Sequence, residues 1–138
     1  MVPVDDKAMT HSTGWTQKTG VSGDYLGTIS ISSTKGKTLT LGSVHAKQLG
    51  VLVTTCSGCG KISFTFAGKT WLANLNTTTT QHLIFFTTAG AYSGIKTNTV
   101  TIKITSATGH KVQIDGLVTI IKGSITSTAS SYRAARLQ

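Results

Sequence analysis

The sequence predicts an all-β fold, a single antiparallel β-sandwich or jelly roll of about eight strands. Apolar residues recur at every second position along most of the chain, which is the period of a strand and not of a helix. Thr and Ser supply 40 of the 138 residues (26 Thr and 14 Ser), whereas charged residues are only 12%. Glu is absent. This composition excludes a helical bundle or coiled coil, which needs Ala, Glu, Lys, Leu and Arg in bulk.

Eight segments carry the strand pattern, with turn residues between them. They are residues 26–32, 37–41, 49–53, 61–66, 70–75, 82–86, 99–105 and 111–121, the last interrupted at Asp115-Gly116. The alternation is clearest in 99–105, where Val100, Ile102 and Ile104 alternate with Thr and Lys. Such alternation is typical of an antiparallel sheet with one face in water. The expected bulky core residues are Phe64, Phe66, Trp71, Phe85 and Phe86.

The length suits one domain, which we expect over residues 15–122. Residues 1–14 are expected to form an N-terminal linker or arm, and residues 123–138 a polar C-terminal tail or arm. No apolar run approaches the roughly 20 residues of a membrane span, so we expect no membrane span.

The net charge of +9 comes from 11 Lys and 2 Arg against four Asp. The Lys residues are spread singly along the chain, and Arg, the usual reader of bases and phosphates, occurs only at Arg133 and Arg136. We therefore expect no specific nucleic-acid partner. Lysines distributed in this way protect strand faces and edges from aggregation. The alternative is weak attraction to polyanions such as cell-wall polymers or anionic glycans.

The two cysteines form the motif Cys56-Ser57-Gly58-Cys59. A thioredoxin-like redox site would need a helix after the pair, and a zinc site would need a second ligand pair at suitable spacing. We expect a local disulfide between Cys56 and Cys59 that closes a tight turn, with Gly58 and Gly60 supplying the unusual backbone angles, and with the redox and zinc sites as the alternatives. A disulfide indicates an oxidising compartment or an extracellular particle.

Catalytic patterns are absent from the sequence: there is no Gly-x-Ser-x-Gly elbow, no paired-carboxylate site and no evident acid partner for a histidine other than Asp115 near His110. We expect no enzyme activity, no cofactor and no metal. A sugar-binding site would use an exposed aromatic ring beside hydroxyl and amide groups. Trp15, Tyr25 and Tyr92 are the candidates because they lie in Gly- and Ser-rich loops, and Tyr92 is the strongest candidate for an exposed ring.

Three segments together resemble the β-jelly-roll (galactose-binding-like) accessory modules of secreted actinobacterial multidomain proteins. They are the start of the chain (Val4-Asp5-Asp6, then Ser12 to Trp15), the central strand with its Cys-x-x-Cys-Gly turn (49–61), and the last two strands (99–104 and 109–118). The resemblance covers residues 4–122. It departs from the family at His110-Lys111, where a Lys/Arg-Pro pair is common.

The resemblance implies a non-catalytic recognition module, and it carries over no catalytic residue. Its best-kept motif corresponds to Asp115-Gly116, where we interpret Asp115 as the acid of a β-bulge, with a calcium ligand as the alternative. We expect a polysaccharide or cell-surface glycan as the partner and an extracellular location. The second hypothesis is a structural subunit of an assembly, such as a phage decoration or tail protein or a surface fibre, with other subunits as partners. Met1 is not followed by a signal peptide, so export as part of a longer chain or by phage lysis is expected.

Overall fold

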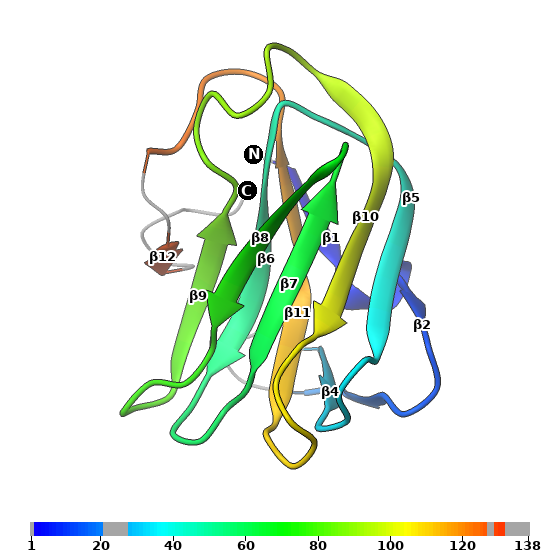
Figure 1. The fold of residues 1–138 in the computed structure, drawn as a ribbon, viewed down its shortest axis with the longest axis vertical. Helices are drawn as coiled ribbons and strands as arrows, with labels where there is room; N and C mark the ends of the chain where they lie inside the picture. Colours follow the sequence, from blue (N-terminus) through cyan, green and yellow to red (C-terminus); the bar gives the residue numbers. More distant parts are fainter. Residues whose placement is uncertain (1, 21–27, 127–128, 132–138) are drawn as a thin grey trace.

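The computed structural model describes residues 2–20, 28–126 and 129–131, and these form two antiparallel sheets packed face to face (Figure 1). One sheet has the strand order β12-β9-β6-β11-β4-β3, with β1 pairing beside β11, and the other has the order β2-β5-β10-β7-β8. No helix among the described residues is long and apolar enough to cross a membrane. The strands of the first sheet are β1 (Val2–Asp5), β3 (Thr16–Lys18), β4 (Ile29–Ser32), β6 (Gln48–Thr55), β9 (Gln81–Phe86), β11 (Val112–Ile120) and β12 (Ala129–Ser131). Those of the second are β2 (Thr10–His11), β5 (Thr38–Ala46), β7 (Lys61–Phe66), β8 (Lys69–Asn74) and β10 (Lys96–Ile104).

The predicted fold class is confirmed, and each of the eight predicted strands overlaps one strand of the structure. The structure adds four short strands, β1, β2, β3 and β12, which are two to four residues long. Segments this short do not show a two-residue period in the sequence. They gain their pairing from longer neighbours, as β1 does from β11.

The N-terminal residues take part in the sandwich. Val2–Asp5 pairs with the second half of β11, a 3₁₀ turn covers Asp6–Ala8, and Thr10–His11 pairs with β5 in the other sheet. The sequence predicts a linker or arm over residues 1–14, and the structure shows this arm joined to both sheets by backbone hydrogen bonds.

The core lies between the sheets. Phe64 and Phe66 are buried there as predicted, whereas Phe85 and Trp71 are half-buried at its margin. Phe86 is also buried as predicted, but in a second cluster with Leu52, Ile84, Val118 and Ile120. All eight residues of β6 are buried, which explains its continuous apolar sequence. Strand β9 is buried on alternate residues and partly covered on the others, so it is not enclosed on both faces.

The outer face of the five-stranded sheet carries a row of threonines. The strand register places Thr10 beside Thr40, Thr40 beside Thr101, Thr101 beside Thr65, and Thr65 beside Thr70. The hydroxyl oxygens of Thr65 and Thr70 lie 2.9 Å apart. The hydroxyl-rich face that the alternation predicts is therefore continuous over β2, β5, β10, β7 and β8.

The interruption at Asp115-Gly116 is a β-bulge, as predicted. The register between β11 and β6 shifts between Ile114 and Gly116. A Cβ atom at Gly116 would lie 2.2 Å from the carbonyl oxygen of Val4. Only glycine therefore lets β1 approach β11 closely enough to pair with it.

Candidate functional site: a polar pocket at the loop end

Three loops that cross from one sheet to the other meet at one end of the sandwich. They connect β6 to β7 (residues 56–60), β8 to β9 (75–80) and β10 to β11 (105–111), and they lie at the bottom of Figure 1. A pocket of about 470 Å³ opens between them. Its volume falls in the range of ligand-binding pockets, about 300–1,000 Å³. The lining residues are Gly58, Cys59, Lys61, Asn76, Thr105, Ser106, Ala107 and His110.

Backbone and side-chain bonds join these loops. The Cys56–Cys59 disulfide closes the first loop, which confirms the predicted pairing. The backbone N–H of Gly58 donates to Asn76 Oδ1 over 2.8 Å, and Gly60 N–H donates to the carbonyl of Lys111 over 2.8 Å. The pocket walls are therefore held by residues from all three loops.

Gly60 lets the β10–β11 loop approach the disulfide loop closely beside the pocket. A Cβ atom at position 60 would lie 2.2 Å from Ser106 Oγ and 3.2 Å from both Cβ and the carbonyl oxygen of His110. Within the described residues, Ser106 Oγ is buried and has no hydrogen-bond partner. Such a hydroxyl costs about 1–3 kcal/mol of desolvation when unpaired.

Four side chains with different hydrogen-bonding chemistry line the pocket: Lys61, Asn76, Ser106 and His110. The Nδ1 atom of His110 lies 3.2 Å from the carbonyl oxygen of Gly58. A carbonyl only accepts, so Nδ1 carries the proton and Nε2 is the acceptor of the neutral ring. The Oδ1 of Asn76 is engaged with Gly58, and its NH₂ group supplies two donors. Sequence analysis did not select these residues, since it assigned the lysines to strand faces and edges and found no catalytic pattern around His110.

Of the predicted aromatic candidates, Tyr92 is not exposed. It is 6% exposed, its hydroxyl donates to the carbonyl oxygen of Phe66, and its ring packs edge-on against Phe66 at 5.5 Å. Burial raises the pKa of the Tyr92 phenol to about 12. Lys69 Nζ lies 5.7 Å from the ring centroid. The expectation of an exposed ring at Tyr92 is wrong, because the loop folds back and seals the sandwich.

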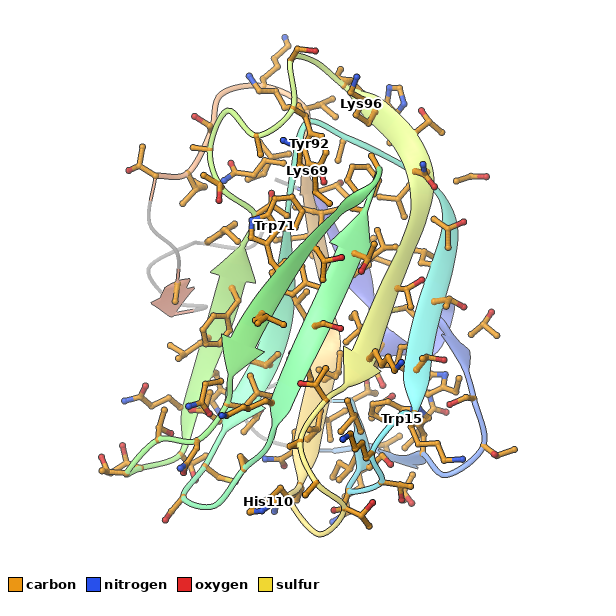
Figure 2. All side chains as sticks on the ribbon, in the orientation of Figure 1. Trp15, Lys69, Trp71, Tyr92, Lys96 and His110 are labelled. Carbon is orange, nitrogen blue, oxygen red and sulfur yellow. A yellow bond between two sulfur atoms is a disulfide. The ribbon has the colours of Figure 1, made fainter. Side chains whose placement is uncertain are left out.

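Trp15 is half-buried and lies away from Tyr92 (Figure 2). Its Nε1–H donates to the carbonyl of Thr38 over 3.1 Å, and its ring meets that of His11 edge-on at 6.2 Å. Tyr25 lies outside the described residues. Of the two candidates that the structure describes, Trp15 and Tyr92 do not form one platform.

A second, smaller hollow of about 260 Å³ lies at the open edge of the sandwich between β8 and β9. Phe64, Trp71, Phe85 and Phe86 contribute its aromatic lining. The ring of Trp71 stacks on Phe64 with an interplanar angle of 21°, and its Nε1–H donates to Thr88 Oγ1 over 3.1 Å. One face of the indole is thus covered by the core, and the hollow is the unfilled end of that core.

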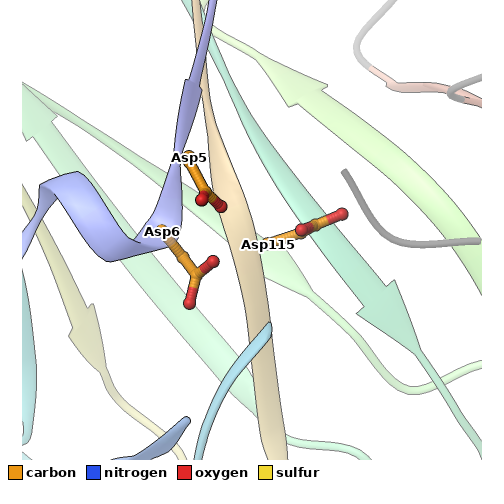
Figure 3. A group of neighbouring side chains, drawn as sticks. All are labelled: Asp5, Asp6 and Asp115. Carbon is orange, nitrogen blue, oxygen red and sulfur yellow. The ribbon is translucent and has the colours of Figure 1, made fainter. Parts of the chain in front are cut away.

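Three carboxylates gather beside the bulge: Asp5, Asp6 and Asp115 each offer an oxygen within 4.8 Å of the others (Figure 3). Calcium takes six to eight oxygens, of which this cluster would supply three. Two hydroxyl groups already donate hydrogen bonds to the Asp6 carboxylate: Thr28 Oγ1 over 2.6 Å and Ser30 Oγ over 2.5 Å. Burial, and then the neighbouring Asp5, raise the pKa of the Asp6 carboxyl.

The chain was compared with known proteins and structures. It matches no protein-family model and no curated protein sequence. It is similar in structure to a β-1,3-glucan-binding CBM6 from Bacillus halodurans, with a TM-score of 0.60, 14% identity and coverage of 86% of this chain and 94% of that one. It is also similar to an exo-β-1,3-galactanase from Phanerochaete chrysosporium, with a TM-score of 0.55, 10% identity and coverage of 85% of this chain and 29% of the enzyme.

These similarities show the fold alone: a β-sandwich shared with carbohydrate-binding modules. They agree with the galactose-binding-like jelly roll that the sequence resembles. The match to the galactanase covers less than a third of that enzyme, so it carries no activity over to this chain.

Proposed function

We propose that this chain is a non-catalytic recognition module that acts outside the cytoplasm and binds a polysaccharide through the loop-end pocket. The observation that carries the proposal is the pocket itself, about 470 Å³ and lined by the side chains of Lys61, Asn76, Ser106 and His110. Sugars present closely spaced hydroxyl groups, and a site with fixed donors and acceptors matches them.

Two further findings support the proposal. The fold is shared with a β-1,3-glucan-binding CBM6, a protein that uses a similar sandwich for carbohydrate recognition. The Cys56–Cys59 disulfide suits an oxidising compartment. Trp15 and Tyr25 remain predicted contributors to sugar binding, and the assembly-subunit alternative remains a prediction that sedimentation analysis tests.

The test is retention of the protein on a panel of insoluble polysaccharides and cell walls. The informative variant is Ala107→Trp, because Ala107 is an exposed pocket residue and an indole there fills the opening without removing a hydrogen bond. Lys96→Trp is the matched control, since Lys96 is exposed at the opposite end of the sandwich (Figure 2).

We expect the wild type and Lys96→Trp to be retained on the same polysaccharide and Ala107→Trp to be lost from it, with no release of reducing sugar in any sample. Failure of the wild type to bind any polysaccharide or cell wall would contradict the proposal. So would equal retention of the wild type and Ala107→Trp.

A further inference from the structure

The pocket has a cationic lining with no acid. Two lining residues are exposed, Lys61 at the start of β7 and His110 on the β10–β11 loop. No described acid lies among the lining residues. The Lys61 ammonium group can only donate hydrogen bonds. The amide oxygen of Asn76 already accepts from Gly58 N–H, which leaves its NH₂ group as donor. Ser106 Oγ has no hydrogen-bond partner within the described residues. The polar lining therefore offers more donors than acceptors.

The charge around the pocket has the same sign. Lys103 is exposed on β10, the strand next to β7, and the register places it opposite Ser63. Lys61 and Ser63 are two positions apart, so Lys61 and Lys103 project from the same outer face as diagonal neighbours. Lys111 is exposed directly after His110. Lys61 therefore lines the pocket, and Lys103 and Lys111 are exposed near its lining residues.

The acids of the described chain lie elsewhere. Asp6 and Asp115 are fully buried and Asp5 is half-buried, all three in the cluster between β1 and β11. Nine of the eleven lysines are exposed, and the other two are half-buried. A surface with this distribution attracts anions over its whole area, and the donor-rich pocket adds a place where one anionic group can be desolvated and bonded directly.

From these features we infer that the pocket takes an acidic sugar, a residue that carries a carboxylate or sulfate group, and that Lys61 pairs with this group. This inference rests on the proposed polysaccharide-binding function and names its ligand class. Lys61 and Asn76 donate to the anionic oxygens.

The test compares polysaccharides that differ only in charge: polygalacturonate against its methyl ester, and dextran sulfate against dextran. Binding is measured by affinity electrophoresis and calorimetry at low salt and at about 0.5 M NaCl, where the Debye length falls to a few ångströms. The variants are Lys61→Gln and, as a matched control with the same loss of charge, Lys96→Gln. Duplex DNA serves as a polyanion without sugar acids.

We expect tighter binding of at least one acidic polymer than of its neutral partner. Lys61→Gln should weaken that binding about tenfold, the size of one charge-assisted hydrogen bond, and Lys96→Gln less than twofold. Carboxylate and sulfate polymers report which anionic group is preferred.

Equal affinity for the charged and neutral partners would overturn the inference and leave the proposed function standing. Equal losses in Lys61→Gln and Lys96→Gln, or binding of DNA as tightly as of the acidic polymer, would also overturn it, since the attraction would then follow net charge alone. No binding to any polysaccharide would overturn the proposed function itself.

Discussion

Ser106 Oγ lies over the backbone of Gly60, so closely that a Cβ atom at position 60 would be 2.2 Å from it. The contact joins the β10–β11 loop to the disulfide loop beside the pocket, which Ser106 lines. Replacing Gly60 by alanine must move Ser106 or His110. The contact thus couples the stability of the loop end to the shape of the pocket.

Gly60→Ala should lower the free energy of unfolding by about 1–3 kcal/mol, the usual cost of overpacking, and should weaken polysaccharide binding. In a Ser106→Ala background the cost should be smaller, because the nearest atom is gone and the two sites are in contact. Gly42→Ala is the control, since no atom lies within 4 Å of its added Cβ. Urea denaturation of the four variants checks this, and additive costs at positions 60 and 106 would contradict it.

Gly116→Ala should destabilise the pairing of β1 with β11. The added methyl group would lie 2.2 Å from the carbonyl oxygen of Val4, a backbone atom that moves only if β1 leaves β11. We expect a loss of about 1–3 kcal/mol in the free energy of unfolding. Hydrogen exchange should become faster in Val2–Asp5 and stay unchanged in β7. Unchanged exchange in β1 would show that the bulge does not depend on glycine.

Removing the disulfide should have a modest effect on stability and a larger one on binding. The bridge closes a loop with a sequence separation of only three residues, so the double variant Cys56→Ser/Cys59→Ser should lose about 2 kcal/mol or less, at the low end of the usual range. Binding should weaken more, because Cys59 and Gly58 line the pocket. Denaturation and calorimetry on the same samples separate the two effects, and unaltered affinity would argue against the pocket.

The carboxylate cluster predicts that the free energy of unfolding changes with pH in the opposite direction to that expected for a salt-bridged acid. Burial and Asp5 raise the pKa of Asp6 in the folded protein. As the pH rises, this carboxyl therefore ionises first in the unfolded state. The free energy of unfolding falls until the pH has passed the pKa of the folded state. Asp6→Asn should remove this part of the pH dependence.

The expectation of no bound metal predicts the same melting temperature with CaCl₂ and with EDTA. A clear increase with CaCl₂ would show that the cluster holds a cation.

The fold could be predicted from the sequence because alternation is a local signal. Each residue of Thr99–Val100–Thr101–Ile102 already shows which face it occupies, and the structure keeps that assignment. The short strands could not be predicted in the same way. Thr10–His11 forms a strand only because it pairs with the edge of β5. That pairing depends on residues far away in the sequence.

The site was less predictable for a related reason. Sequence reasoning searched for aromatic side chains in loops and selected Tyr92, but a ring with an apolar face gains more by packing on Phe66 than by facing water. Lys61, Asn76, Ser106 and His110 come from separate loops, and only the antiparallel pairing of the strands places these loops at one end. The Cys-x-x-Cys-Gly turn was the available signal, since Gly60 marks a position where another loop approaches closely.

Chemical-shift mapping of the ¹⁵N-labelled protein, titrated with an oligosaccharide cut from whichever polysaccharide retains it, tests the account most directly. Our account predicts that the largest shifts fall on Gly58 to Lys61, Asn76 and Thr105 to His110, the residues around the pocket. Shifts centred instead on the threonine row of the five-stranded sheet, at Thr40, Thr65 and Thr101, would contradict it, because the ligand would then bind the flat face and leave the pocket empty.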